Sequence, residues 1–120
     1  MVNENMTSEV KISNEVIAAI AANAAKTVDG VSGLTDGLVD SVTKVLSGTY
    51  TRGVDVDIND VNSTISLSLV VKYDFFIPEI AEKVQISVKK SVQKMTGIEI
   101  GIVNINIQGI NFSEDTVVKK

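Results

Sequence analysis

The sequence predicts an α+β fold, a two-layer sandwich in which a small, mostly antiparallel sheet carries helices packed on one face. Three observations lead to this prediction. Val (19) and Ile (14) dominate the apolar residues, and β-branched side chains favour pleated sheet. Stretches with helical spacing of apolar residues are interleaved with stretches of two-residue spacing. The clearest pair of neighbouring strands reads as an antiparallel hairpin, which fits this class better than a parallel, doubly wound sheet.

The length of 120 residues indicates one domain, because a chain of this size buries roughly two thirds of its surface around one core. Residues 1–8 and 113–120 are polar and have no periodic apolar pattern, so both are predicted to be flexible tails. The single domain then covers residues 9–112.

The first helix is predicted to begin after Ser13, whose hydroxyl can accept a hydrogen bond from a free N–H group of the first turn. Its apolar face is predicted to consist of Val16, Ile17, Ile20, Ala21 and Ala24. Glycines at positions 30, 33 and 37 then end the helix, and a short strand is predicted over 31–34. A second, shorter helix is predicted over 38–46 and ends before Gly48.

Alternation with a period of two begins after Gly53. Apolar residues at 54, 56 and 58 point one way and Asp55, Asp57 and Asn59 point the other, which indicates a half-buried strand. Residues 60–63 are predicted to form a turn, and the alternation returns over 65–73. The two runs together predict a β-hairpin.

The best-defined helix is predicted to begin at Pro78, because proline fits the first turn of a helix. Glutamates at 79 and 82 lie near its start and lysines at 89, 90 and 94 near its end, which matches the helix dipole. Its predicted apolar stripe consists of Ile80, Val84, Val88, Val92 and Met95. Gly97 is predicted to end it.

The last strand changes phase, because isoleucines at 98, 100 and 102 are followed by apolar residues at 103, 105 and 107. With Gly101 beside the change, this pattern predicts a β-bulge within 101–103. Residues 97–110 contain a single charge, that of Glu99. Their apolar character favours a central strand paired on both sides, whereas an exposed edge of this composition would invite pairing with another chain.

The composition of the chain excludes several kinds of catalytic and metal-binding site. The sequence contains no His and no Cys, which excludes zinc sites of the Cys/His kind, thiol catalysis and His-based triads. Asp55, Asp57, Asn59 and Asp60 resemble half of a calcium loop, but Asp60 stands where an EF-hand needs Gly, so these residues are expected to keep one strand face in water. No spacing singles out a pair of carboxylates. We therefore predict no catalytic, metal or cofactor site, no small-molecule substrate and no enzymatic activity.

Nucleic-acid binding is the alternative function that the sequence leaves open. Gly30-Val-Ser-Gly33 matches the GXXG string with which KH modules clamp a nucleic-acid backbone. The string contains no basic residue, Asp29 and Asp36 flank it, and a net charge of −4 with a pI near 4.7 attracts no polyanion. We therefore expect a turn at this string and no nucleic-acid partner.

Two groups of residues are candidates for partner binding. Lys83, Lys90 and Lys94 lie on one face of the predicted helix, either as a solvated surface or as a docking strip for an acidic partner or an anionic membrane surface. Phe75 and Phe76 precede the helix, where they form either an apolar spot that faces a partner or a hydrophobic staple beneath the helix start. Of these two alternatives, the staple is favoured.

Four segments together resemble the alkaline-shock and general-stress envelope proteins of Gram-positive bacteria, over about residues 9–112. They are VKISNEVIAAIAANAAKTVDGVSGL, VDVDI, SLSLVVKY and IPEIAEKVQISVKKSVQKMTGIEIGIVNINIQGI. The last is the most specific, because the helix with Gln85, the stop at Thr96-Gly97 and the Val103-Asn-Ile-Asn-Ile strand follow in the family's order. Tyr73-Asp74-Phe75-Phe76 departs from the family, which often has Tyr-Gly before the Ile-Pro helix start.

The resemblance implies a small, non-enzymatic protein of the cell-envelope stress response and cell-wall homeostasis, with no catalytic motif to transfer. It also implies a scaffold or adaptor that associates into a homo-oligomer and binds a membrane-anchored partner. The first ten residues lack the basic and apolar regions of a secretion signal. We therefore expect a cytoplasmic protein that is peripheral to the inner face of the cell membrane through its partner.

Overall fold

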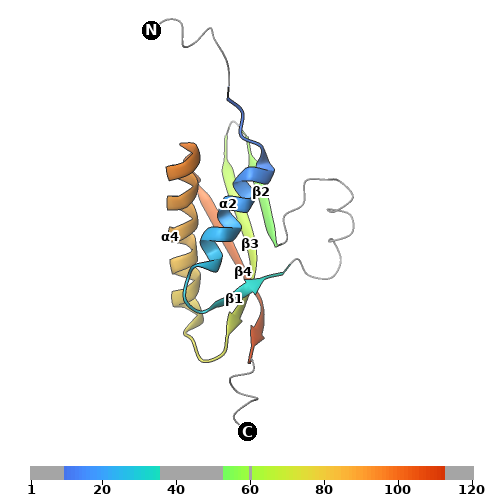
Figure 1. Cartoon of the computed structure of the whole chain (residues 1–120), viewed down its shortest axis with the longest axis vertical. Coiled ribbons are helices and arrows are strands. Elements are labelled where there is room, and N and C mark those ends of the chain that lie inside the picture. Colours follow the sequence, from blue (N-terminus) through green and yellow to red (C-terminus); the bar gives the residue numbers. More distant parts are fainter. Residues whose placement is uncertain (1–9, 36–52, 60, 113–120) are drawn as a thin grey trace, which may run out of the picture.

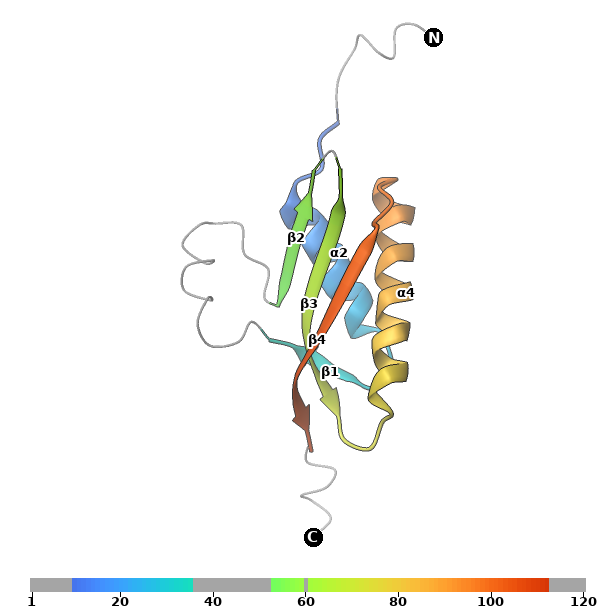
Figure 2. The ribbon, with the colours of Figure 1, turned by 180° about the vertical axis from the view of Figure 1, so that it is seen from behind.

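Two helices and a four-stranded sheet make up the computed structural model of the chain, which describes residues 10–35, 53–59 and 61–112. The elements in chain order are α2 (Asn14–Lys26), β1 (Val31–Leu34), β2 (Val54–Ile58), β3 (Ser63–Lys72), α4 (Ile77–Thr96) and β4 (Ile102–Asn111). Both helices lie on one face of the sheet (Figure 1), and the view from behind shows the strands in front of α2 (Figure 2). The predicted α+β, two-layer class is therefore confirmed. The predicted helix over 38–46, the predicted tails 1–8 and 113–120, and Asp60 lie outside the described residues.

β3 is the strand on which the sheet is built, because each of the other strands pairs with it. β1 and β2 pair with it in antiparallel orientation, β1 near its end and β2 near its start, and β4 runs parallel along nearly its whole length. The predicted hairpin of β2 and β3 is confirmed. Asn59 shapes its turn, since the side-chain Oδ1 accepts hydrogen bonds from the N–H groups of Val61 and Asn62.

The inward side of β3 lies at the centre of the core. Its inward side chains have an exposed fraction of 0%: Ile65, Leu67, Leu69 and Val71. The predicted stripe of α4 packs on the same core and is buried at Ile80, Val84, Val88 and Val92. The described core is made of aliphatic and alanine side chains and contains no aromatic ring.

The buried side of α2 is the predicted one except for Val16, since Ile17, Ala21 and Ala24 are buried and Ile20 is partly buried against the core. Ser13 caps the helix as predicted, and its Oγ accepts a hydrogen bond from the N–H of Val16 at 3.2 Å. Val16 itself, predicted on the apolar face, is 48% exposed. The buried side contains Ile17 and five alanines, Ala18, Ala21, Ala22, Ala24 and Ala25. These short side chains let α2 lie close to both α4 and the sheet, and this packing extends the buried side to Ala18, Ala22 and Ala25.

α4 begins and ends as predicted, with Pro78 in its first turn and Gly97 in the left-handed conformation that ends it. Met95, predicted on the buried stripe, is instead 69% exposed. It lies in the last turn beside a shallow hollow between the two helices, which is also lined by Ala19 and Ser91. The short side chains of both helices leave this end of the helix pair open.

The predicted bulge at 101–103 is wrong in its position. β4 starts one residue after Gly101, so the change of phase falls in the connection from α4. There the N–H of Gly101 donates to the carbonyl and to Oγ of Ser63, at 3.1 and 2.8 Å. The change therefore lies at the first contact with β3, just before the regular pairing that begins with Thr64 and Ile102. The register shift within β4 lies between Ile107 and Gly109.

β4 is an edge strand of the described sheet, and the favoured central position is wrong. Among the described residues it pairs with β3 alone. Val103 is buried, and Ile105 and Ile107 are partly buried. Asn104 and Asn106, which lie between them, are exposed. The apolar residues thus bury one face of the strand against the core, and this burial does not require a second neighbouring strand.

A hydrogen bond from Gln85 ties the middle of α4 to β4, because its Nε2 donates to the carbonyl of Val103 at 2.9 Å. Gln85→Ala leaves this carbonyl without its partner, so we expect the free energy of unfolding to fall by about 1–3 kcal/mol. Gln93→Ala, at an exposed position of the same helix, should change it by less than about 0.5 kcal/mol. Urea unfolding measures both variants, and equal losses would contradict the role given to Gln85.

Gly30 follows α2 with φ +101°, and a Cβ built on it would lie 2.9 Å from both Cδ1 of Ile80 and Cδ2 of Phe75. The backbone conformation favours glycine, and an added Cβ would also force the side chains of Ile80 and Phe75 to shift. We expect Gly30→Ala to lower the free energy of unfolding by about 2–4 kcal/mol, measured by urea unfolding. The matched control is Gly33→Ala, where φ lies outside the left-handed region and no atom lies within 4 Å of the added Cβ. A comparable loss at Gly33 would overturn this explanation.

Candidate partner-binding surface

All the aromatic side chains that the structure describes are exposed at one end of the sheet. The sequence has five aromatic residues, and the exposed fractions of the four described ones are 54% for Tyr73, 40% for Phe75, 70% for Phe76 and 53% for Phe112. At this end β3 leads into α4 and β4 finishes (Figure 2). Aromatic side chains supply large buried areas in most cores, and exposed ones are typical of interfaces. We call these four residues the aromatic end.

Contacts at the ends of the strands position Tyr73 and Phe112 of the aromatic end. The rings of Tyr73 and Phe112 have centroids 5.1 Å apart and are tilted by 39°. The N–H of Tyr73 donates to the carbonyl of Asn111 at 3.1 Å, and Nδ2 of Asn111 donates to Oγ of Ser32 at 2.8 Å. Since Ser32 lies in β1, these bonds join the ends of three strands, and the sheet positions the surface.

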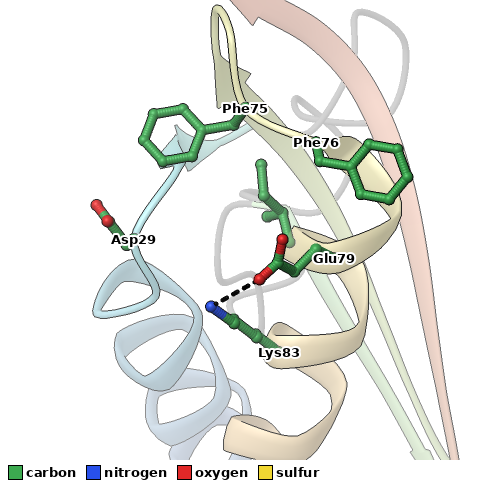
Figure 3. Close-up of a pocket in the computed structure, with 6 residues that line it drawn as sticks. Asp29, Phe75, Phe76, Glu79 and Lys83 are labelled. Atoms are coloured by element: carbon green, nitrogen blue, oxygen red, sulfur yellow. Dashed lines mark ion pairs between the residues drawn. The ribbon is translucent and has the colours of Figure 1, made fainter.

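Phe75 and Phe76 border a hollow of about 240 Å³ between the turn after α2 and the first turns of α4 (Figure 3). We call it the α4-start hollow. Its lining residues are Asp29, Phe75, Phe76, Glu79, Ile80 and Lys83. The hollow therefore brings the sequence-predicted Lys83, Phe75 and Phe76 together.

The two phenylalanines take different positions at the hollow. Phe76 is the N-cap residue of α4, so Phe75 and Ile80 occupy the two positions of a hydrophobic staple. Both side chains approach Gly30 closely. The ring of Phe76 points to the opposite side (Figure 3) and is the more exposed of the two. Phe75 thus takes the staple position that the sequence favours, and an apolar spot at Phe76 that faces a partner stays a prediction.

The charges around the hollow are mainly acidic. Glu79 and Lys83 form an ion pair at 3.2 Å, with both side chains 58% exposed (Figure 3). Such an exposed pair contributes little to stability, at most about 0.5 kcal/mol. Asp29 and Asp74 have no ion-pair partner within the described part of the chain. Asp74 directly precedes Phe75 and has a left-handed φ of 75°.

The three predicted lysines are exposed on α4 and follow one another along this helix. Lys83 lines the hollow and is paired with Glu79, whereas Lys90 and Lys94 lie further along the helix. Ile86 lies between Lys83 and Lys90 in the sequence and is 55% exposed. We call Lys83, Lys90 and Lys94 the lysine row.

Sequence reasoning missed Asp29, Glu79 and Ile80 as members of this site. The two α4 residues had a local signal, because they lie in the helix turn that follows the two phenylalanines. Asp29 had none, since it comes from the turn after α2 and meets α4 only through tertiary packing.

Other sequence motifs also have defined places. Asp55 and Asp57 are exposed on β2, and no group of acidic side chains that could hold a metal ion is found among residues 10–35, 53–59 and 61–112. Gly30 and Gly33 of the GXXG string lie in a turn and in β1, not in a loop between two helices. Neither described helix is long and apolar enough to cross a membrane.

Comparison with known proteins identifies relatives. The model of the alkaline-shock protein 23 family, described as having a cell envelope-related function, matches residues 2–112. The uncharacterized protein YqhY of Bacillus subtilis (strain 168) is 38% identical, over 87% of this chain and 78% of that protein. YloU, also uncharacterized and from the same strain, is 34% identical over 85% of this chain and 88% of its own length. A stress response regulator gls24 homolog of Streptococcus pyogenes serotype M3 is 24% identical over 98% of this chain and 69% of its own length.

No solved structure matches the chain. The family match covers nearly the whole sequence, including every described element. It agrees with the resemblance to alkaline-shock and general-stress envelope proteins carried by the helix and strand segments. The chain therefore belongs to the alkaline-shock protein 23 family, whose function is related to the cell envelope.

Proposed function

We propose that the chain is a non-enzymatic protein of the cell-envelope stress response and cell-wall homeostasis. In this proposal it acts as a self-associating scaffold or adaptor and docks to a membrane-anchored partner at the inner face of the cell membrane. Family membership supports the envelope role, and the Streptococcus pyogenes relative named as a stress response regulator homolog supports the stress role. The observation that carries the adaptor role is the free edge of β4.

The edge of β4 has neither the charged side chains nor the proline that often protect an edge strand. Alternate residues of such a strand direct their N–H and C=O groups away from the neighbouring strand, where another strand can pair with them. Natural edges are commonly blocked by charged side chains or proline. The ten residues of β4 contain neither. One of its carbonyls, that of Val103, is bound by Gln85.

A second copy of the chain is the partner that best fits this edge. β2 also has a free edge within the described sheet, but it carries Asp55 and Asp57 among five residues, so two copies of β2 would bring carboxylates together. Two copies of β4 bring no charges together. In an antiparallel pair related by a two-fold axis, asparagine would face asparagine on the exposed side and isoleucine would face isoleucine on the inner side. The sheet would then continue from one copy into the other.

The lysine row supports docking to a partner with an acidic surface. Lys90 and Lys94 are exposed and have no ion-pair partner among the described residues. Their two ammonium groups would steer an acidic segment towards the second half of α4, whereas Lys83 is paired with Glu79. The same row gives the membrane-anchored partner a place to bind that leaves the edge of β4 available.

Lysines on the edge of β4 should weaken self-association. We expect the double substitution Asn104→Lys and Asn106→Lys to weaken it by roughly ten-fold or more, because like charges would meet across the new strand pair. Both positions are exposed, so the melting temperature should stay within a few degrees of the original. Sedimentation velocity over a range of protein concentrations measures the effect.

The control for this variant is Asp57→Lys on β2, which changes the net charge by the same amount on the same sheet and is also exposed. It should self-associate like the unaltered protein. If the β4 double variant associates as strongly as the control, or if the unaltered protein remains monomeric at high concentration, self-association through β4 is wrong.

Reversing the charge of the lysine row should remove binding of the partner. With Lys83, Lys90 and Lys94 changed to Glu, a crosslinking pull-down from membranes should lose at least about nine tenths of the membrane protein it recovers, through like-charge repulsion. Thermal unfolding should change little, because exposed charges contribute little to stability.

The matched control changes Lys11, Lys26 and Lys72 to Glu, three exposed lysines outside α4. It makes the same change in net charge and should keep the partner. Equal recovery by both triple variants would mean that the lysine row is only a solvated surface.

A further inference from the structure

We propose that the α4-start hollow binds a short segment of another protein in which an apolar side chain is flanked by lysine or arginine. This inference rests on the proposed adaptor function and deepens it, because it names the chemistry of the segment that the membrane-anchored partner presents. The argument uses the size of the hollow, its apolar surface and its charge.

The size of the hollow suits a side chain better than a small molecule. Its volume of about 240 Å³ lies below the range of about 300–1,000 Å³ that is usual for small-molecule sites. Its apolar surface comes mainly from Phe75 and Ile80, because the ring of Phe76, which borders the hollow, points to the opposite side. Ile80 is buried at 3% exposure, and Phe75 is held in place against Gly30, so this surface is already formed. A leucine or phenylalanine of a docking segment could therefore bind without a large rearrangement.

The rim of the hollow carries more negative than positive charge. Glu79 and Lys83 neutralise each other at 3.2 Å, which leaves Asp29 at the hollow and Asp74 beside Phe75. Neither has an ion-pair partner within the described ranges. A purely apolar segment would remove water from these carboxylates without replacing its hydrogen bonds, and an acidic segment would be repelled. Lysine or arginine beside the apolar anchor would pair with Asp29, and the charge of Asp74, next to Phe75 in the chain, would add to the attraction.

Phe76 adds a second reason for basic residues. Its ring is 70% exposed and is turned away from Phe75 (Figure 3), so its face is open to a side chain of the docking segment. A guanidinium or ammonium group over such a face gains a cation–π interaction. An apolar anchor and its basic neighbours can thus be accepted by adjacent parts of one surface.

The required segment matches a recurring feature of membrane-anchored proteins. Segments next to a membrane span on the cytoplasmic side are enriched in lysine and arginine, and they adjoin apolar residues of the span. An anionic lipid surface is a poorer match, because the carboxylates of Asp29 and Asp74 would repel it. The lysine row runs from Lys83 away from the hollow, so an acidic stretch of the same partner could lie along Lys90 and Lys94.

The test titrates the full chain with short labelled peptides and follows its amide resonances by NMR. The probe has the sequence Arg-Arg-Leu-Phe-Arg-Arg. Two controls replace either all four arginines with glutamate or the Leu-Phe pair with two serines. The arginine peptide should bind and shift the resonances of Asp29, Gly30 and the start of α4. Added salt should weaken this binding. Both controls, and vesicles of anionic lipid, should bind at least about five-fold more weakly.

Matched variants locate the site. Asp29→Asn with Asp74→Asn removes two charges without a change of volume, and asparagine tolerates the left-handed φ of Asp74. We expect this double variant, and separately Phe76→Ser, to weaken binding of the basic peptide by roughly five- to ten-fold. The control variant Asp57→Asn with Glu99→Gln removes two exposed charges outside the hollow. It should bind the basic peptide as strongly as the unaltered protein does.

Three results would overturn the inference. They are equal binding of the arginine and glutamate peptides, shifts centred away from the hollow, and equal effects of the two double variants. The proposed function has separate readouts, because sedimentation and the membrane pull-down do not use the peptide. Loss of peptide binding with intact partner recovery would refute this site alone, and peptide binding without self-association or partner recovery would refute the adaptor proposal.

Discussion

Hydrogen bonding along both sides of β3 is the constraint on which the described structure depends. β1 and β2 share one side of this strand, and β4 occupies the other. Its inward row of Ile, Leu and Val side chains has no exposed surface, and both α2 and α4 pack against it. Because every strand is attached through β3, no pair of the remaining strands can form a stable sheet without it.

This arrangement also decides which surfaces are left for partners. The backbone of β3 is satisfied on both sides, so the unpaired groups of the described sheet fall on β4 and on the outer sides of β1 and β2. The core is filled with Val, Ile, Leu and Ala, which leaves the described aromatic rings at one end of the sheet. Edge pairing and aromatic contacts are both common means of protein recognition. A protein of this composition can therefore act through its surface, as the proposed adaptor does.

Local signals in the sequence predicted most of the fold, and long-range packing accounts for the errors. Ser13, Pro78 and Gly97 mark helix ends because their effects act within one turn. The alternation of apolar and polar residues in β2 and β3 predicted their hairpin, because the two strands are neighbours in the sequence. The position of β4 and the exposure of Val16 on α2 depend on which elements meet in space, and no local pattern encodes that. The site divides in the same way, since Phe75 and Phe76 were visible in the sequence, whereas Asp29 joins them only in the folded chain.

The central claim, that two copies meet through β4, can be tested by a distance between them. Since the chain has no cysteine, Asn104→Cys and Asp57→Cys each provide a single site for a spin label, on β4 and on β2. At concentrations where the protein associates, pulsed electron resonance should give a short, narrow distance between labels at 104 and a longer distance between labels at 57. A shorter distance between the labels at 57, or no dipolar coupling at 104, would contradict the account.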